Sequence, residues 1–214
     1  MGRPFTRIAF TPSVREAQAH YGSRSPRSEA EANSGEPDAL TEAEADFIEQ
    51  MDGFYQATVN EDGWPYVQFR GGPRGFLRVL DAKTIAFADF RGNGQYISVG
   101  NINAAQRIAL ILMNQAAPAR LKIWGTARVI DRSNDPAFIE ALQVKGYTGR
   151  AERAIVIDVL AYDWNCPQHI TPRFTRSEIR EMNGPLLAEI EALRKRVPAP
   201  TAAGQASGAA GDSN

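Results

Sequence analysis

The sequence predicts a mainly β fold of the α+β class, in which about seven antiparallel strands form a closed or split barrel flanked by a few helices. The first observation behind this prediction is a series of short strand-like segments joined by short turns. The second is that residues 120–130 alternate between apolar and polar side chains, as a half-buried antiparallel strand does. The third is that residues 154–162 are apolar on both faces, which indicates a well-covered central strand.

Capping and turn residues predict the first elements of the domain. Thr41 and Glu44 fit a capping box and apolar residues follow on one face, so residues 40–51 are expected to form a helix. Residues 60–63, Asn-Glu-Asp-Gly, then separate the two strands of a hairpin. A second hairpin follows the glycine-rich turn at 71–75. The four strands expected here are 54–59, 65–70, 76–81 and 84–89.

The rest of the domain adds three strands and further helices. Asp135 and Pro136 fit the start of a helix that runs to about residue 145. Two helical stretches follow the last strand. Thr175 and Glu178 open the first of them, and an apolar stripe over 186–197 marks the second. The three strands expected here are 107–114, 120–130 and 154–162.

Composition divides the 214 residues into three parts. Residues 1–39 are expected to be an N-terminal arm and linker, because almost no apolar side chains occur over 23–39. Residues 40–197 form the expected folded domain, and a short helix over 13–21 is expected to pack against it. Residues 198–214 consist largely of Pro, Ala, Gly and Ser and are predicted to be a disordered tail.

Charge and cysteine content narrow the class of protein. The chain has 24 basic and 25 acidic residues, so nothing in this balance indicates nucleic acid or an anionic membrane as a partner. No segment approaches the roughly 20 apolar residues of a membrane-spanning helix, and no apolar segment of a signal peptide follows Arg3 and Arg7. Cys166 is the single cysteine, which fits a reducing compartment. A soluble cytoplasmic protein is expected.

The segment after the fourth expected strand, residues 90–101, is dense in Gly, Asn, Gln and Ser. A strand that ends in small polar residues exposes backbone N–H groups beside short donors, which suits an anionic group such as a phosphate. An ordinary connection from a strand to a helix contains the same residue types. On the residues alone, both interpretations stay open.

Other residues with metal-binding, nucleophilic or charged side chains have simpler explanations. Cys166 and His169 are two residues of the metal-ligand type, but a structural zinc site needs four, so no metal site is expected. Cys166 as a nucleophile with His169 as its base has no further support in the sequence. Arg120 and Lys122 share one face of their strand, where they either meet an anionic group or form a solvated surface.

Several motifs then occur in a recognisable order between about residues 40 and 175. In chain order these are ATVNEDGWP at 57–65, FADF at 87–90, GNGQYISVGN at 92–101, RIAL at 107–110, RLKIWG at 120–125 and WNCPQHITPR at 164–173. In this order and spacing the sequence resembles the pyridoxamine 5′-phosphate oxidase family, the FMN-binding split barrels. The resemblance implies an antiparallel split β-barrel with flanking helices, and a homodimer that binds FMN at the subunit interface.

The resemblance also nominates residues that bind the cofactor, although it names no catalytic residue. They come from the second expected strand, the end of the fourth strand, the following loop, the sixth strand and the segment after the seventh strand. In that order they are Gln68, Phe69 and Arg70, then Ala88, Asp89 and Phe90, then Asn93, Gln95 and Ser98, then Arg120 and Lys122, and Trp164.

The sequence departs from pyridoxamine oxidases in two respects. The Arg-Lys pair that holds the FMN phosphate in those enzymes is matched here by Asn93 and Gly94, or by Ile97 and Ser98, depending on the alignment. The Arg-x-His substrate signature near the C-terminus is absent as such, so pyridoxamine phosphate is not the expected substrate. Positive charge for the phosphate must come from elsewhere, and the candidates are Arg70, Arg91, Arg120 and Lys122.

Three functions follow as hypotheses. The first is an FMN-dependent oxidoreductase that uses NAD(P)H or a similar reductant on an unidentified small molecule. The second is a non-catalytic flavin-nucleotide-binding protein, a carrier or a sensor. The third is a barrel without cofactor that serves as a dimeric interaction module.

Overall fold

The computed structural model describes residues 4–24, 37–166 and 168–196. The chain divides into two compact units, one up to Pro172 and one from Arg173 onward. The predicted tail at 198–214 and most of the predicted linker lie outside the described residues.

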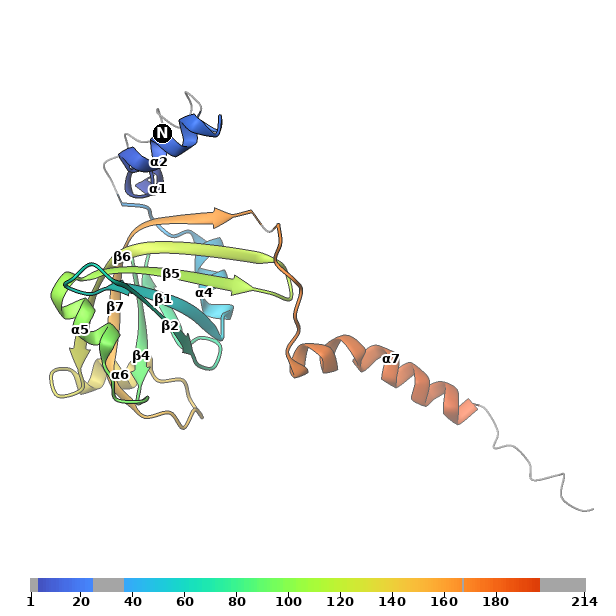
Figure 1. The fold of residues 1–214 in the computed structure, drawn as a ribbon. Coiled ribbons are helices and arrows are strands. Elements are labelled where there is room, and N and C mark those ends of the chain that lie inside the picture. Colours follow the sequence, from blue (N-terminus) through green and yellow to red (C-terminus); the bar gives the residue numbers. More distant parts are fainter. Residues whose placement is uncertain (1–3, 25–36, 167, 197–214) are drawn as a thin grey trace, which may run out of the picture. The chain divides into compact units, whose positions relative to one another are not determined.

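Seven strands form one sheet in the first unit, and every pair of neighbours is antiparallel (Figure 1). The order across the sheet is β2-β1-β5-β6-β7-β4-β3. The strands are β1 (Gly53–Val59), β2 (Pro65–Gly71), β3 (Leu77–Asp81), β4 (Thr84–Phe90), β5 (Arg107–Asn114), β6 (Ala119–Asp131) and β7 (Ala151–Asn165). This confirms the predicted fold class, a mainly β split barrel with flanking helices.

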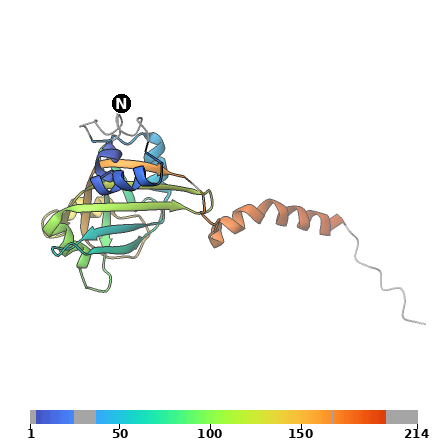
Figure 2. The ribbon, with the colours of Figure 1, turned by 45° about the horizontal axis from the view of Figure 1, so that its top comes forward.

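The sheet curves, as the view of Figure 2 also shows, and the side chains that it encloses form an apolar core. Phe54 of β1 lies with its ring centroid 5.6 Å from that of Phe76 and 5.2 Å from that of Phe87 on β4. These rings therefore join strands from opposite ends of the sheet order. All three side chains are almost completely buried, so this contact is part of the central core.

Two of the helices pack on different apolar clusters, one at the central core and one on the outer face of β4 and β7. In α4 (Glu42–Gln50) the predicted capping box of Thr41 and Glu44 is present. The helix α6 (Pro136–Leu142) begins where Asp135 accepts a hydrogen bond from the Phe138 backbone N–H, and it ends before the predicted residue 145. Its buried side chains pack on the outward-facing alanines of β4 and β7.

Three helices of the first unit differ from the prediction. The predicted helix at 13–21 exists as α2 (Pro12–His20), but α2 buries none of its residues. The preceding helix α1 (Pro4–Ala9), which was not predicted, contacts the sheet instead, with the Phe5 ring 4.9 Å from the Trp124 ring on β6. The polar segment after β4 also ends in a helix, α5 (Ile97–Ala105).

In the described part of the second unit, a single helix, α7 (Arg176–Arg196), stands where two helical stretches were predicted. Thr175 and Glu178 cap its start, and Pro185 lies inside it. Among all the described residues, no helix is both long and apolar enough to cross a membrane.

Candidate functional site

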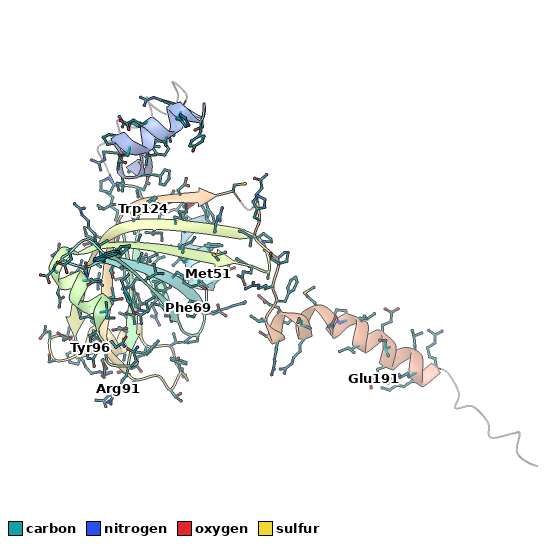
Figure 3. The ribbon with its side chains drawn as sticks, in the orientation of Figure 1. Met51, Phe69, Arg91, Tyr96, Trp124 and Glu191 are labelled. Carbon is teal, nitrogen blue, oxygen red and sulfur yellow. The ribbon has the colours of Figure 1, made fainter. Side chains whose placement is uncertain are left out.

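An open pocket lies between β2, the end of β4 and the start of α5. Figure 3 shows Tyr96 and Arg91 at this end of the barrel, away from Trp124, which lies beside α1. The pocket is lined by Tyr66, Gln68, Arg70, Asp89, Phe90, residues 92–99 and Arg153. A second, adjoining pocket shares Arg70, Asp89 and Phe90 with the first and adds Phe69, Gly71, Phe76, Phe87 and Ala88.

A buried carboxylate holds two arginines at the base of this pocket. Asp89 is 3% exposed, and each of its oxygens accepts a hydrogen bond from a different guanidinium. Arg70 donates to Oδ1 from β2, and Arg153 donates to Oδ2 from β7 at 2.8 Å. Because β2 is the last strand at its end of the sheet, the Arg70–Asp89 ion pair bridges the split of the barrel. A buried charge needs such pairing, since water no longer solvates it.

Arg153 makes further contacts. Its NH2 group lies 2.9 Å from Oε2 of Glu152, and its guanidinium stacks on the Tyr96 ring, 4.7 Å from the centroid. Burial alone would lower the pKa of Arg153. The hydrogen bond and the charge attraction to Asp89, with further hydrogen bonds to Tyr96 and Glu152, outweigh burial, so this pKa lies above its ordinary value. Arg153 therefore remains a fixed positive charge in the pocket.

The loop before α5 is folded tightly. The Gln95 backbone N–H donates to Asn93 Oδ1 at 3.2 Å, and Asn93 Nδ2 donates to Gln95 Oε1 at 3.3 Å. Tyr96, the residue that precedes the helix, has a φ of 52°, in the left-handed region that residues other than glycine seldom adopt. No side chain caps the start of α5. The first N–H groups of a helix have no partner within it, so those of residues 97–99 can serve a ligand in the pocket.

Neutral polar groups continue from the pocket into the barrel. Ser98 donates to Gln68 Oε1 at 3.0 Å, and the buried Asn101 donates to Thr58 Oγ1 at 2.9 Å. Gln56 is fully buried on β1 directly opposite Gln68, and its amide has no hydrogen-bond partner among the described residues. Gln68 and Ser98 therefore add an amide and a hydroxyl to the pocket lining, and the other three residues extend this polar series into the barrel.

The structure brings most of the nominated residues together. The first pocket includes Gln68, Arg70, Asp89, Phe90, Asn93, Gln95 and Ser98, and the adjoining pocket includes Phe69 and Ala88. Of the other nominated cations, Arg91 lines neither pocket and is 67% exposed, with Glu152 at 3.8 Å.

Three nominated residues line neither pocket within one copy of the chain. Arg120 on β6 donates to the backbone oxygen of Cys166 at 3.0 Å. Lys122 belongs to the same strand, with its side chain on the same face. Trp164 near the end of β7 donates its indole N–H to Glu44 Oε1 at 2.6 Å. Their role at the cofactor stays a prediction.

Sequence reasoning missed Arg153, Tyr96 and Tyr66. The predicted strand began at residue 154, although Arg153 continues the inward series of Ile155 and Ile157. An arginine in the inward series of an apolar strand indicates a buried ion pair, and this signal was available. The described residues contain no group of three or more potential metal ligands, and Cys166 is exposed.

The outward face of β1 and β2 is apolar and exposed. Tyr55, Val59, Val67 and Phe69 are exposed by 37–59% and lie side by side on the two paired strands. The Phe69 ring lies against the backbone of Gly53 and Gly71, which have no side chains to displace it. An exposed apolar patch on a folded domain is typical of an interaction surface.

Comparison with known proteins decides the family. The family model described as Pyridoxamine 5′-phosphate oxidase matches residues 40–160, more than half of the chain. The chain belongs to this family. The match confirms the resemblance inferred from the sequence motifs and covers all strands of the sheet from β1 to most of β7.

The chain is also similar to several solved structures. HupZ of Group A Streptococcus is 20% identical, with 63% of this chain and 99% of that chain covered and a TM-score of 0.48. An F420 reductase is 21% identical, with coverages of 58% and 98% and a TM-score of 0.42. A Clostridium acetobutylicum protein related to general stress protein 26 is 16% identical, with coverages of 63% and 92% and a TM-score of 0.43. No curated protein matches the chain.

Proposed function

We propose that the protein binds FMN in the pocket between β2, β4 and α5 and works as an oxidoreductase. The observation that carries this proposal is the donor set of the pocket in a chain of this family. Two guanidiniums, of Arg70 and Arg153, line the first pocket, and the carboxylates of Asp89 and Glu152 balance their charge, so the pocket offers an anionic group charged hydrogen-bond donors rather than an excess of positive charge. Amide and hydroxyl groups of Gln68, Asn93, Gln95 and Ser98 suit the hydroxyl groups of a ribityl chain.

Each part of the pocket would hold a different part of the cofactor. The first N–H groups of α5, with Arg70, would hold the phosphate. The ends of β2 and β4 would carry the ring system, beside Phe69, Ala88 and Phe90 of the adjoining pocket. FMN, when bound, supplies the electron and hydride chemistry, while the protein orients it and sets its electrostatic surroundings.

The lining also favours a reaction led by the cofactor. Among the described residues of the first pocket, Asp89 is the one carboxylate, and no His, Lys or Cys is present. Both carboxylate oxygens of Asp89 are already bound by arginines. The same observation supports a second candidate, a flavin carrier or sensor without catalysis. In both cases the proposed site of action is the cytoplasm.

A homodimer completes the proposed site. The exposed apolar face of β1 and β2 lies next to the adjoining pocket, because Phe69 belongs to both. A second copy that covers this face would bury it and would supply Arg120, Lys122 and Trp164 to the cofactor. The reductant is proposed to be NAD(P)H or a similar donor, acting on a small molecule.

The deciding experiment is the ultraviolet–visible spectrum of the purified protein together with its native mass. Flavin absorption bands and a mass of two chains are expected after reconstitution with FMN. Bleaching under anaerobic NADH or NADPH, with turnover on an added acceptor, would favour the oxidoreductase over the carrier. A protein that takes up no flavin at micromolar FMN contradicts the proposal and favours an interaction module.

A further inference from the structure

Arg153 connects three elements around the pocket. Its guanidinium binds Asp89 at the end of β4, Glu152 at the start of its own strand and the Tyr96 ring in the loop before α5. The Arg153 side chain is only 12% exposed, whereas Tyr96 is 50% exposed. Arginine is suited to this position because its planar group can donate in several directions and stack at the same time.

Tyr96 depends on these contacts. A left-handed tyrosine is unfavourable and persists only where its surroundings hold it. Two interactions do so here: the stacking of Arg153 on the ring, and a hydrogen bond of 3.3 Å from the Tyr96 hydroxyl to Glu152 Oε2. Both partners belong to the start of β7. The turn that aims the start of α5 at the pocket is therefore fixed from β7.

The fixed turn at Tyr96 matters for the phosphate end of the proposed FMN ligand. The usual basic pair of the family is not matched in the loop, so the loop must recognise a phosphate with backbone N–H groups and neutral side chains. Hydrogen bonds of that kind depend strongly on direction, whereas a long basic side chain can adjust. Ring contacts at β2 and β4 do not depend on the turn at Tyr96.

We propose that Arg153, acting through Tyr96, is a positioning residue that makes the site selective for the phosphorylated flavin, FMN, over riboflavin. This inference rests on the proposed function. Loss of the Arg153 contact would allow the loop to relax and misdirect the N–H groups of α5. The site would then keep its affinity for the ring and ribityl chain and lose its preference for the phosphate.

The test compares FMN and riboflavin binding, by quenching of flavin fluorescence, for the wild-type protein, R153K and Y96A. R153K keeps the charge but loses the planar group. Y96A removes the stacked ring from an exposed position and leaves the Asp89–Arg153 pair intact. For both variants the affinity for FMN should fall about tenfold, which corresponds to about 1.4 kcal/mol, while the affinity for riboflavin changes by less than about twofold.

The matched control is R128K, which alters an arginine paired at the same distance of 2.8 Å with Asp158 but exposed on β6. It should change neither affinity. Equal losses for FMN and riboflavin in Y96A, or no loss for FMN in either variant, would overturn the inference while leaving flavin binding established. A wild-type protein that binds neither flavin would instead overturn the proposed function, and the inference with it.

Discussion

Trp164 donates its indole N–H to the carboxylate of Glu44, with 2.6 Å between Nε1 and Oε1. The two residues stand 120 positions apart, near the end of β7 and in the first turn of α4. The same carboxylate accepts hydrogen bonds from the backbone N–H and the hydroxyl of Thr41, and the Trp164 ring packs on Phe47 with 4.7 Å between centroids. Glu44 thus fastens the start of α4 to the last strand of the barrel.

The first prediction concerns pH. Burial alone would raise the pKa of Glu44, but hydrogen bonds from Thr41 and Trp164 outweigh it, so this pKa lies below its ordinary value of 4.5. The carboxylate therefore stabilises the fold fully above pH 4.5, and this contribution disappears as the pH falls through the lowered folded-state pKa. E44Q should lower the free energy of unfolding by about 1.5–3 kcal/mol at neutral pH, and the difference from wild type should shrink in acid.

Urea unfolding followed by circular dichroism, at neutral pH and in acid, measures this difference. The control is E42Q, which alters an exposed glutamate of the same helical turn and should have little effect at either pH. A difference between wild type and E44Q that stays constant with pH would contradict the assignment.

The second prediction concerns the paired arginines. D89N keeps the shape of the side chain but leaves Arg70 and Arg153 without their shared counter-charge, so it should cost about 3 kcal/mol of stability. D158N is the control, because Asp158 is 52% exposed and pairs with Arg128 at the surface. It should cost at most about 1 kcal/mol. Urea unfolding measures both variants. If D89N lowers the free energy of unfolding by no more than D158N does, the buried ion pairs of Asp89 do not stabilise the fold as predicted.

The third prediction concerns the close approach of β6 and β7. A Cβ at Gly125 would lie 2.5 Å from the Asp158 backbone oxygen and 2.8 Å from an Ile157 methyl group. G125A should therefore destabilise the fold by about 1–3 kcal/mol. By contrast, a Cβ at Gly100 in α5 meets nothing within 4 Å, so G100A should stabilise by about 0.5–1 kcal/mol. Thermal unfolding distinguishes the two, and opposite signs are expected.

The fourth prediction concerns the proposed dimer. V67D places a charge in the exposed apolar face of β1 and β2 and should convert a dimer to a monomer in sedimentation velocity. L80D makes the same change at another exposed apolar residue, on β3, and should leave the dimer intact. If V67D remains dimeric, the partner covers a different surface.

The fifth prediction asks which copy supplies Arg120. In one copy Gln95 lines the pocket and Arg120 does not, so a shared site would combine Gln95 of one copy with Arg120 of the other. Q95A and R120A should each retain less FMN than wild type. When the two variants are mixed and refolded together, a mixed dimer then has one intact site and one doubly altered site. Recovery of one tightly bound FMN per mixed dimer is expected, whereas a site built from a single copy would show no recovery.

Local pattern predicted the parts of this fold that depend on neighbouring residues. The strands, the capping box of Thr41 and Glu44 and the start of α6 all follow from nearby side chains. The helix α5 was not predicted, because Tyr96, the residue before it, is not a usual capping residue. In α7 a continuous helix was missed, because Pro185 normally ends one.

The place of Arg153 in the inward series of β7 indicates a buried ion pair, but its partners could not be predicted from local pattern. Asp89 and Arg153 are opposite each other in the register of β4 and β7, and Arg70 reaches them across the split. Such contacts depend on the register of strands far apart in the sequence and on the curvature of the sheet. The family resemblance supplied Arg70 and Asp89 but not their third partner.

The ion pair between Arg70 and Asp89 also has a mechanical consequence. β2 and β3 are the terminal strands of the sheet, and the pair joins β2 to β4 by side chains rather than by a ladder of backbone hydrogen bonds. Local opening of the barrel requires the least free energy where only side chains join two strands. Amide protons on the free edge of β2 should therefore exchange with solvent faster than those of β6, which has a strand on each side.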